Sequence, residues 1–322
     1  MFGGSMRIVI AIGGNSLIKE SSKISALDQM EQVKASSKMI ADIAMEGHEL
    51  VITHGNGPQV GFLLRMSELS EKEIPLMPLD YGVAHTQGSI GFQMQNALHN
   101  YFQSHKIHRS VATIVTQTVV DQNDPAFQYP SKPIGSFFSK EEIEEHARTL
   151  GWKFMEDSGR GYRRIVPSPI PKEIVEKEVI EFLLNQHVLV VAVGGGGIPV
   201  IRDSHGIHGI EAVIDKDLAS SLLAREIHAD LFVVSTAVPN AYLHYNQQNQ
   251  IALETVTTEE IRNYLSQNMF GKGSMEPKIK SALQFTEASK KTAIITSPEN
   301  IREAIHGHKG TRIIWGGKDE DI

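Results

Sequence analysis

The sequence predicts an α/β protein built around a mainly parallel sheet. Short runs of aliphatic and β-branched residues recur along the chain, and longer segments with helical periodicity separate them. The runs are apolar at nearly every position, as in strands that are covered on both faces. We expect strands at 7–12, 49–53, 111–115, 188–193, 231–235, 292–296 and 311–315.

Helices are expected where apolar residues recur at spacings of three and four. They are predicted at 26–45, which Gly47 ends, and at 174–185, 218–228, 259–267 and 277–288. Because strands and helices alternate, most strands should run parallel.

One stretch, residues 120–167, breaks this alternation. It contains several prolines and the aromatic pair Phe137-Phe138, and a helix start at Ser139 to Glu142 follows that pair. Such a long irregular segment inside an α/β unit is typical of an insertion. We therefore predict a small protruding subdomain at 120–167.

Composition excludes several classes of function. The 322 residues are enough for one large or two medium cores. The chain has 31 basic and 38 acidic residues, a net charge of −7, which argues against nucleic acid as a partner. It has no cysteine, so disulfides, thiolate zinc sites and cysteine nucleophiles are excluded.

No apolar run approaches the roughly 18 to 20 residues of a membrane span, and the start of the chain lacks the layout of a signal peptide. We therefore expect a cytoplasmic protein with no membrane partner. Residues Met1 to Ser5, ahead of Met6, are left out of the fold prediction.

Glycine-rich loops follow three of the predicted strands. They read Gly13-Gly14-Asn15, His54-Gly55-Asn56-Gly57-Pro58-Gln59 and Gly194-Gly195-Gly196-Gly197-Ile198-Pro199. A tight turn explains one glycine pair, but three loops at equivalent strand ends favour an anion site, because glycine lets backbone N–H groups approach an anion closely. None of the loops matches the Walker A or Rossmann pattern.

Three lysines in loop contexts could supply the positive charge that phosphoryl transfer needs. They are Lys132, Lys216 and Lys278. A single lysine is more often a solvated surface charge. Lys216, however, lies between Asp215 and Asp217 at the head of an apolar helix, where Asp217 could cap the helix or hold lysine ammonium groups.

The 14 histidines show no paired spacing of the kind that holds a metal, so we predict no protein metal site. His54, beside a glycine loop, is kept as a candidate for supporting the site. If the protein uses ATP, Mg²⁺ should arrive with the nucleotide, held mainly by phosphates and water.

With these loops and lysines in place, the chain resembles the carbamate kinases, a branch of the amino acid kinase family. The resemblance runs from about Arg7 to Trp315. It is carried by the segments Ala11–Asn15, Thr53–Gly61, Asn123–Phe127, Ser131–Gly135, Gly159–Arg164, Gly194–Val200, Ala212–Ser220 and Gly273–Lys278.

The resemblance implies an open three-layer αβα sandwich and a reversible phosphoryl transfer between ATP and carbamate. It implies an N-terminal acceptor lobe at 6–225, including the subdomain at 120–167, and a C-terminal nucleotide-binding lobe at 226–322. It further implies a homodimer, Mg²⁺ with the nucleotide, and a role in making ATP from carbamoyl phosphate during amino-acid or purine catabolism, with arginine metabolism as one route.

By matching position, the resemblance places Lys132 on the acceptor side, Lys216 and Lys278 around the transferred phosphoryl group, and Asp217 as the residue that orients lysines. The residues implied for acceptor and phosphoryl binding are Gly13, Gly14, Asn15, Gly55, Asn56, Gly195 and Gly196. Those implied for the nucleotide are Thr236, Ala237, Tyr242, Met275 and Lys278.

The sequence departs from the family pattern at Pro239, Ser136 and Glu276. Glu276 is expected to face solvent, since a charged side chain is seldom buried unpaired. Two alternatives stay open at this point. One is a kinase for a larger amino-acid carboxylate; the other is a non-catalytic sensor of ATP or carbamoyl phosphate, suggested by Pro239 and Glu276.

Overall fold

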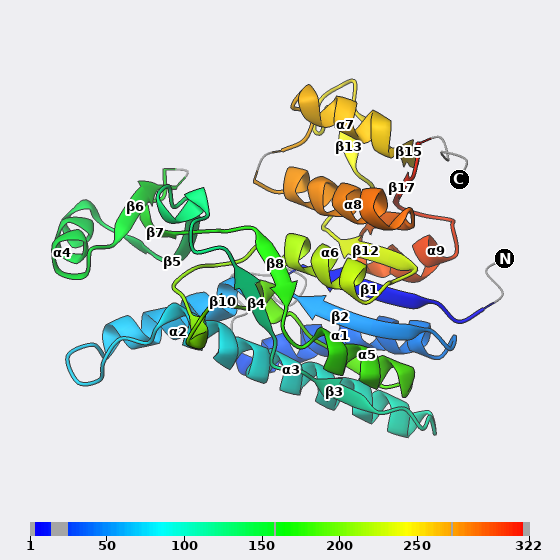
Figure 1. Ribbon diagram of the computed structural model, residues 1–322, viewed down its shortest axis with the longest axis horizontal. Coiled ribbons are helices and arrows are strands. Elements are labelled where there is room, and N and C mark those ends of the chain that lie inside the picture. Colours follow the sequence, from blue (N-terminus) through cyan, green and yellow to red (C-terminus); the bar gives the residue numbers. More distant parts are fainter. Residues whose placement is uncertain (1–3, 14–24, 158, 272, 318–322) are drawn as a thin grey trace.

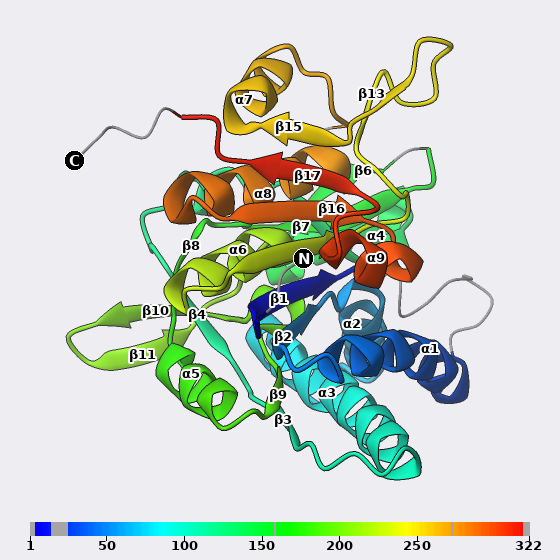
Figure 2. The same ribbon diagram turned by 90° about the vertical axis from the view of Figure 1, so that its right-hand side faces the viewer.

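The computed structural model describes residues 4–13, 25–157, 159–271 and 273–317. In this part of the chain the central sheet has eight strands. In spatial order they are β15 (Thr255–Thr257), β17 (Thr311–Ile314), β16 (Thr292–Thr296), β12 (Leu231–Ser235), β1 (Arg7–Ile12), β2 (Glu49–His54), β9 (Leu189–Val191) and β3 (Val111–Thr113). All pairs from β16 to β3 are parallel, and β17 runs antiparallel to β16 (Figures 1 and 2).

Helices cover both faces of this sheet (Figure 2). One face packs against α1 (Ala26–Ala44), α3 (Leu79–Ser104) and α9 (Ile301–Ile305). The other packs against α5 (Lys177–Asn185), α6 (Lys216–Glu226), α7 (Thr258–Ser266) and α8 (Met275–Ser289). The three-layer αβα sandwich and the mainly parallel sheet are therefore confirmed.

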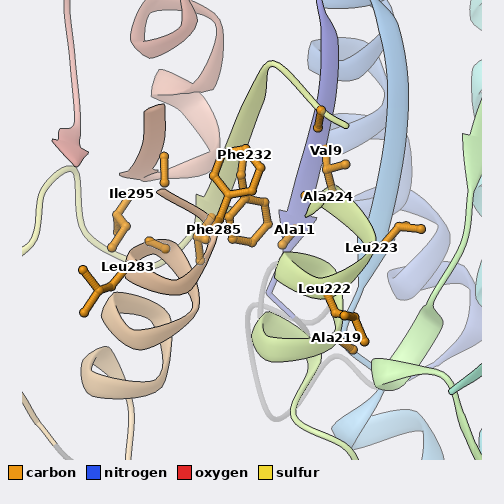
Figure 3. Packing of buried hydrophobic residues seen from close by; sticks show 14 of the residues in the cluster. Val9, Ala11, Ala219, Leu222, Leu223, Ala224, Phe232, Leu283, Phe285 and Ile295 are labelled. Atoms are coloured by element: carbon orange, nitrogen blue, oxygen red, sulfur yellow. The ribbon is translucent and has the colours of Figure 1, made fainter. Parts of the chain in front are cut away.

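The apolar runs are buried on both faces because alternate side chains enter different cores. In β1, Val9 and Ala11 join the core beneath α6 and α8, whereas Ile8 and Ile10 join the core beneath α1 and α3. Figure 3 shows the first of these cores, where the rings of Phe232 and Phe285 lie 5.5 Å apart between their centroids.

The predicted insertion forms a separate small sheet that projects from the sandwich (Figure 1). It contains β5 (Lys132–Phe138), β7 (Tyr162–Val166) and β6 (Lys153–Glu156), with α4 (Lys140–Leu150) beside it. The predicted helix start is confirmed: Ser139 caps α4, and Glu142 completes a capping box. A one-turn helix, η2 (Pro125–Phe127), precedes β5.

A second small sheet lies between the insertion and the main sheet. Its strands are β11 (Gly206–Gly209), β10 (Ile198–Asp203), β4 (Gln117–Val120) and β8 (Pro171–Ile174). A two-stranded ribbon, β13 (Tyr242–Leu243) with β14 (Ile251–Ala252), lies near α7.

Several predicted boundaries were wrong, for local reasons. The segment expected as a helix from Ile174 first completes β8, where Ile174 pairs with Thr118, and turns helical only at Lys177. The helix expected from Pro277 begins at Met275, since a proline in the first turn sacrifices no internal hydrogen bond.

The short helix α9 was not predicted, and neither were the two long helices α2 (Gly57–Leu69) and α3. Both are rich in glycine, which lowers helix propensity. Gly91 is required because a Cβ atom there would overlap the side chain of Thr113 on β3. No helix in the described part of the chain is long and apolar enough to cross a membrane.

Candidate active site

A cavity of about 810 Å³ opens at the carboxyl ends of β1, β2 and β12. Gly13 follows β1, Gly55 and Asn56 follow β2, and Thr236 follows β12, and all of them line the cavity. In a parallel sheet these strand ends share one edge, which is where α/β proteins bind ligands. The parallel order of the strands thus brings together loops that are far apart in the sequence.

The carboxylate of Asp217 lies between two lysine ammonium groups at the wall of this cavity. Its Oδ1 is 2.7 Å from Lys216 Nζ, and its Oδ2 is 2.7 Å from Lys278 Nζ. Lys216 Nζ also donates to the carbonyl oxygen of Ile12, at 3.2 Å, where β1 ends. One carboxylate therefore orients two positive charges beside the strand ends.

Asp215, and not Asp217, caps α6. Its Oδ1 accepts hydrogen bonds from the backbone N–H groups of Asp217 and Leu218, at 3.0 and 3.2 Å. Of the two roles that the sequence left open for Asp217, the structure selects the one that holds lysines. The alternative of a solvated surface charge is wrong for Lys216, whose side chain is 11% exposed.

Burial and charge act in opposite directions on the pKa values of this cluster. Burial alone would raise the pKa of Asp217, but the ammonium groups of Lys216 and Lys278 outweigh it and lower that pKa to about 2. Burial, together with Lys278, lowers the pKa of Lys216, whereas Asp217 raises it. The charge of Lys216 thus depends on its partner Asp217.

The third glycine loop lies against the second. It forms a one-turn helix, η3 (Gly194–Gly196), with φ of +66° at Gly195, and Val193 before it has φ of +53°. A Cβ atom at Gly195 would overlap the side-chain amide of Asn56. Glycine is therefore needed here for close approach as well as for backbone conformation.

Residues that the sequence did not single out hold this loop in place. Gln87 of α3 donates its side-chain N–H to the carbonyl oxygens of Gly194 and Thr116, both at 3.0 Å. Its Oε1 accepts from the backbone N–H of Thr116, at 2.8 Å. Because α3 was not predicted, no sequence signal pointed to Gln87.

His54 supports the same region as a neutral group. Its side chain is buried, and its Nδ1–H donates to the carbonyl oxygen of Gly55, at 3.1 Å. Burial lowers its pKa to about 4, and the nearby charge of Lys216 adds to this effect. His54 is therefore uncharged at neutral pH.

Lys132 approaches the cavity from the subdomain. It begins β5 and lines the cavity, and its Nζ lies 3.5 Å from Oδ2 of Asp215. Three lysines distant in sequence thus meet around the N-terminus of α6. Of the other predicted residues, Gly195 and Ala237 line the cavity, and Gly14 and Asn15 lie outside the described residues.

Gly196, Tyr242 and Met275 are not among the residues that line this cavity. Gly196 lies behind the lining, where a Cβ atom would meet the carbonyl oxygen of Ile214 at 2.5 Å. Tyr242 lies beside Tyr245, and Met275 packs against the core. Their assignment to binding stays a prediction. Lining residues that the sequence analysis missed include Gln32, Ser36 and Met39 of α1, Ser235, Asp215 and Glu299.

Two of the three departures from the family pattern, Glu276 and Pro239, are not among the residues that line the cavity. The carboxylate of Glu276 lies 2.7 Å from Nζ of Lys280, one turn further along α8, and is not part of the cavity lining. Pro239 is exposed, and its carbonyl oxygen accepts from the hydroxyl of Thr296, at 3.2 Å. In the described ranges, no group of three or more histidine, aspartate or glutamate side chains could hold a metal ion.

Comparison with known proteins identifies the family. The family model named "Amino acid kinase family" matches residues 6–297. The carbamate kinase of Thermococcus kodakarensis is 45% identical over 311 residues, a match that covers 96% of this chain and 99% of the relative. That of Pyrococcus furiosus is 46% identical over 310 residues, with the same coverage. The chain belongs to the carbamate kinase family.

A solved member of the family has nearly the same fold. The carbamate kinase from Giardia lamblia bound to AMP-PNP has a TM-score of 0.92 at 40% identity, and the match covers 97% of this chain and 99% of that one. N-acetylglutamate synthase from Neisseria gonorrhoeae matches at 13% identity and a TM-score of 0.56, over 96% of this chain and 61% of that one, which shows a shared fold alone. The family predicted from the sequence is confirmed.

Proposed function

We propose that this protein is a carbamate kinase, which transfers a phosphoryl group reversibly between ATP and carbamate. The observation that carries the proposal is the Asp217 carboxylate, which holds Lys216 and Lys278 at 2.7 Å each beside glycine loops at the strand ends. Phosphoryl transfer needs fixed positive charge and alignment more than covalent catalysis. This cavity supplies both.

In the direction of ATP synthesis, a terminal phosphate oxygen of ADP attacks the phosphorus of carbamoyl phosphate. The bond from phosphorus to the carbamate oxygen breaks, and carbamate leaves with the electron pair. Lys216 and Lys278 stabilise the negative charge that spreads over the transferring group, because Asp217 holds both ammonium groups in place before the reaction. In the reverse direction a carbamate oxygen attacks the γ-phosphorus of ATP.

The remaining roles divide between the two substrates. Lys132 binds the acceptor from the subdomain, with backbone and amide donors from the loops around it: Gly13, Gly14, Asn15, Gly55, Asn56, Gly195 and Gly196. Thr236, Ala237, Tyr242 and Met275 contact the adenosine. Residues 6–225 then form the acceptor lobe and 226–322 the nucleotide lobe.

Mg²⁺ enters as part of the nucleotide substrate. The Asp217 carboxylate is already occupied by two lysines, so phosphate oxygens and water provide most of the ligands. When bound, the ion neutralises phosphate charge during transfer. We further propose a cytoplasmic homodimer that runs towards ATP synthesis in amino-acid or purine catabolism, including arginine breakdown.

The test is an assay of ATP formation from carbamoyl phosphate, ADP and Mg²⁺, with Lys278→Ala as the control. Wild-type protein should form ATP at a rate far above that of the variant. Equal rates would refute the proposal. A panel of acceptors in the reverse direction separates carbamate from larger carboxylates; a preference for N-acetylglutamate by orders of magnitude would favour the alternative kinase.

A further inference from the structure

One short segment, which follows β11 in the chain and precedes α6, makes a series of contacts with the subdomain. This connecting strip, Glu211–Asp215, leads directly into Lys216 and alternates in its contacts. Two of its five residues, Ala212 and Ile214, are buried, at 0% and 2% exposed, and Ile214 belongs to the core under α6. The other three residues, Glu211, Val213 and Asp215, each contact the subdomain.

The three contacts occur in order along the strip. The carboxylate of Glu211 lies 2.6 Å from a guanidinium nitrogen of Arg164. The backbone N–H of Val213 donates to the carbonyl oxygen of Pro167, at 2.9 Å. Asp215 meets Lys132 at 3.5 Å. The strip therefore fixes the subdomain at three points, of which the last lies at the active site.

Arg164 and Lys132 lie on one face of the subdomain sheet. Lys132 pairs with Val166, and Ile134 pairs with Arg164, in the antiparallel ladder of β5 and β7. Paired residues and residues two apart in a strand share a face. Ile134 and Val166, between the two cations, are buried against Val60 and Leu64 of α2.

Arg164 and Lys132 differ in burial and in the length of their ion-pair contacts. The side chain of Arg164 is 10% exposed, its contact with Glu211 is short, and its guanidinium carbon lies 4.0 Å from the centre of the Trp152 ring. The side chain of Lys132 is 42% exposed and lies 3.5 Å from its partner. The longer and more exposed contact with Asp215 holds Lys132 only weakly. The position of Lys132 therefore depends on how the subdomain sheet is anchored.

We propose that Arg164 is a positioning residue, which through Glu211 anchors the subdomain so that Lys132 is held at the N-terminus of α6 during phosphoryl transfer. The inference rests on the proposed function, since it assigns Lys132 to the acceptor. Arg164 itself does not line the cavity. Its effect should therefore be confined to the step that uses Lys132.

The test combines Arg164→Met, which keeps an unbranched apolar chain against Trp152 but removes the charge, with Lys132→Ala. With Mg-ADP saturating, Arg164→Met should lower kcat/KM for carbamoyl phosphate about tenfold, because a misplaced group loses alignment. The KM for ADP should change by less than about twofold. In the Lys132→Ala background, Arg164→Met should cost less than about twofold, because the residue that it positions is gone.

Two further variants make the result specific. Glu211→Gln, at an exposed side chain, should give the same selective loss without unfolding the protein. Arg202→Met, which breaks an arginine–glutamate pair with Glu173 away from the cavity, should leave both constants unchanged. Equal losses from Arg164→Met with and without Lys132 would overturn the inference. A wild-type protein that forms no ATP would instead overturn the proposed function, and this inference with it.

Discussion

Replacing Asp217 with asparagine removes the negative charge that Lys216 and Lys278 share. All three side chains are less than a fifth exposed, at 7%, 11% and 17%, so solvent screens the cluster little. Leaving buried charges without their partner costs about 3 to 5 kcal/mol. Because one carboxylate serves two lysines, we expect Asp217→Asn to lower the free energy of unfolding by about 4 kcal/mol.

The same substitution should lower turnover about 100- to 1000-fold, the cost of losing one preorganised charge-stabilising group. It should also change the pH dependence. Asp217 raises the pKa of Lys216, so without it the ammonium group loses its proton at lower pH. The alkaline fall in kcat should therefore move to lower pH.

Urea unfolding at pH 7.5 and ATP formation between pH 6 and 9.5 measure these effects. Glu276→Gln is the matched control, because its carboxylate also lies 2.7 Å from a lysine, but one that is 53% exposed. It should change stability by less than about 1 kcal/mol. The assigned role of Asp217 would be wrong if Asp217→Asn lowered the free energy of unfolding by as little as this control. It would also be wrong if the alkaline fall in kcat moved to higher pH.

Three other predictions follow from the site. Lys216→Ala should reduce kcat more than it weakens ATP binding measured by calorimetry, because its charge acts mainly in the transition state; a loss of affinity with unchanged kcat would contradict this. Gly195→Ala should destabilise the protein by about 1 to 3 kcal/mol, because φ of +66° is strained for alanine and the new methyl group would overlap Asn56; urea unfolding at wild-type stability would argue against that packing. His54 has a pKa of about 4 in the folded protein and about 6.5 when unfolded, so the unfolded state binds more protons between these pH values. The free energy of unfolding should therefore fall by about 3 kcal/mol as the pH drops from about 6.5 to 4. His54→Gln should flatten that part of the curve of unfolding free energy against pH, and an unchanged slope would exclude His54 as its source.

The sequence predicted the layout of the fold because burial on both faces leaves a local pattern. Runs such as Arg7–Ile12 and Leu231–Ser235 are apolar at nearly every position, which is a property of the residues themselves. The pattern failed for α3, where Gly91 is explained by packing against β3 rather than by helix propensity. That packing partner is distant in the sequence.

Part of the site could be predicted for the same reason. Parallel strands end at one edge, so the loops after β1, β2 and β9 had to share that edge once the sheet was predicted; their adjacency comes from the strand order of the structure. Lys216 and Asp217 also lie side by side in the sequence. Their chemistry followed from residue type and from the family resemblance, without knowledge of side-chain directions.

Only the tertiary structure decided which side chains meet. Lys278 lies 61 residues from Asp217, yet contacts it at 2.7 Å because α8 packs against α6. The sequence offered Asp217 either as the cap of the helix or as the partner of lysines, but α6 begins at Lys216, which makes Asp215 the cap and leaves Asp217 to the lysines. A sequence records the residues that can pair; the distances between them, and hence the charges they keep, depend on packing between elements far apart in the chain.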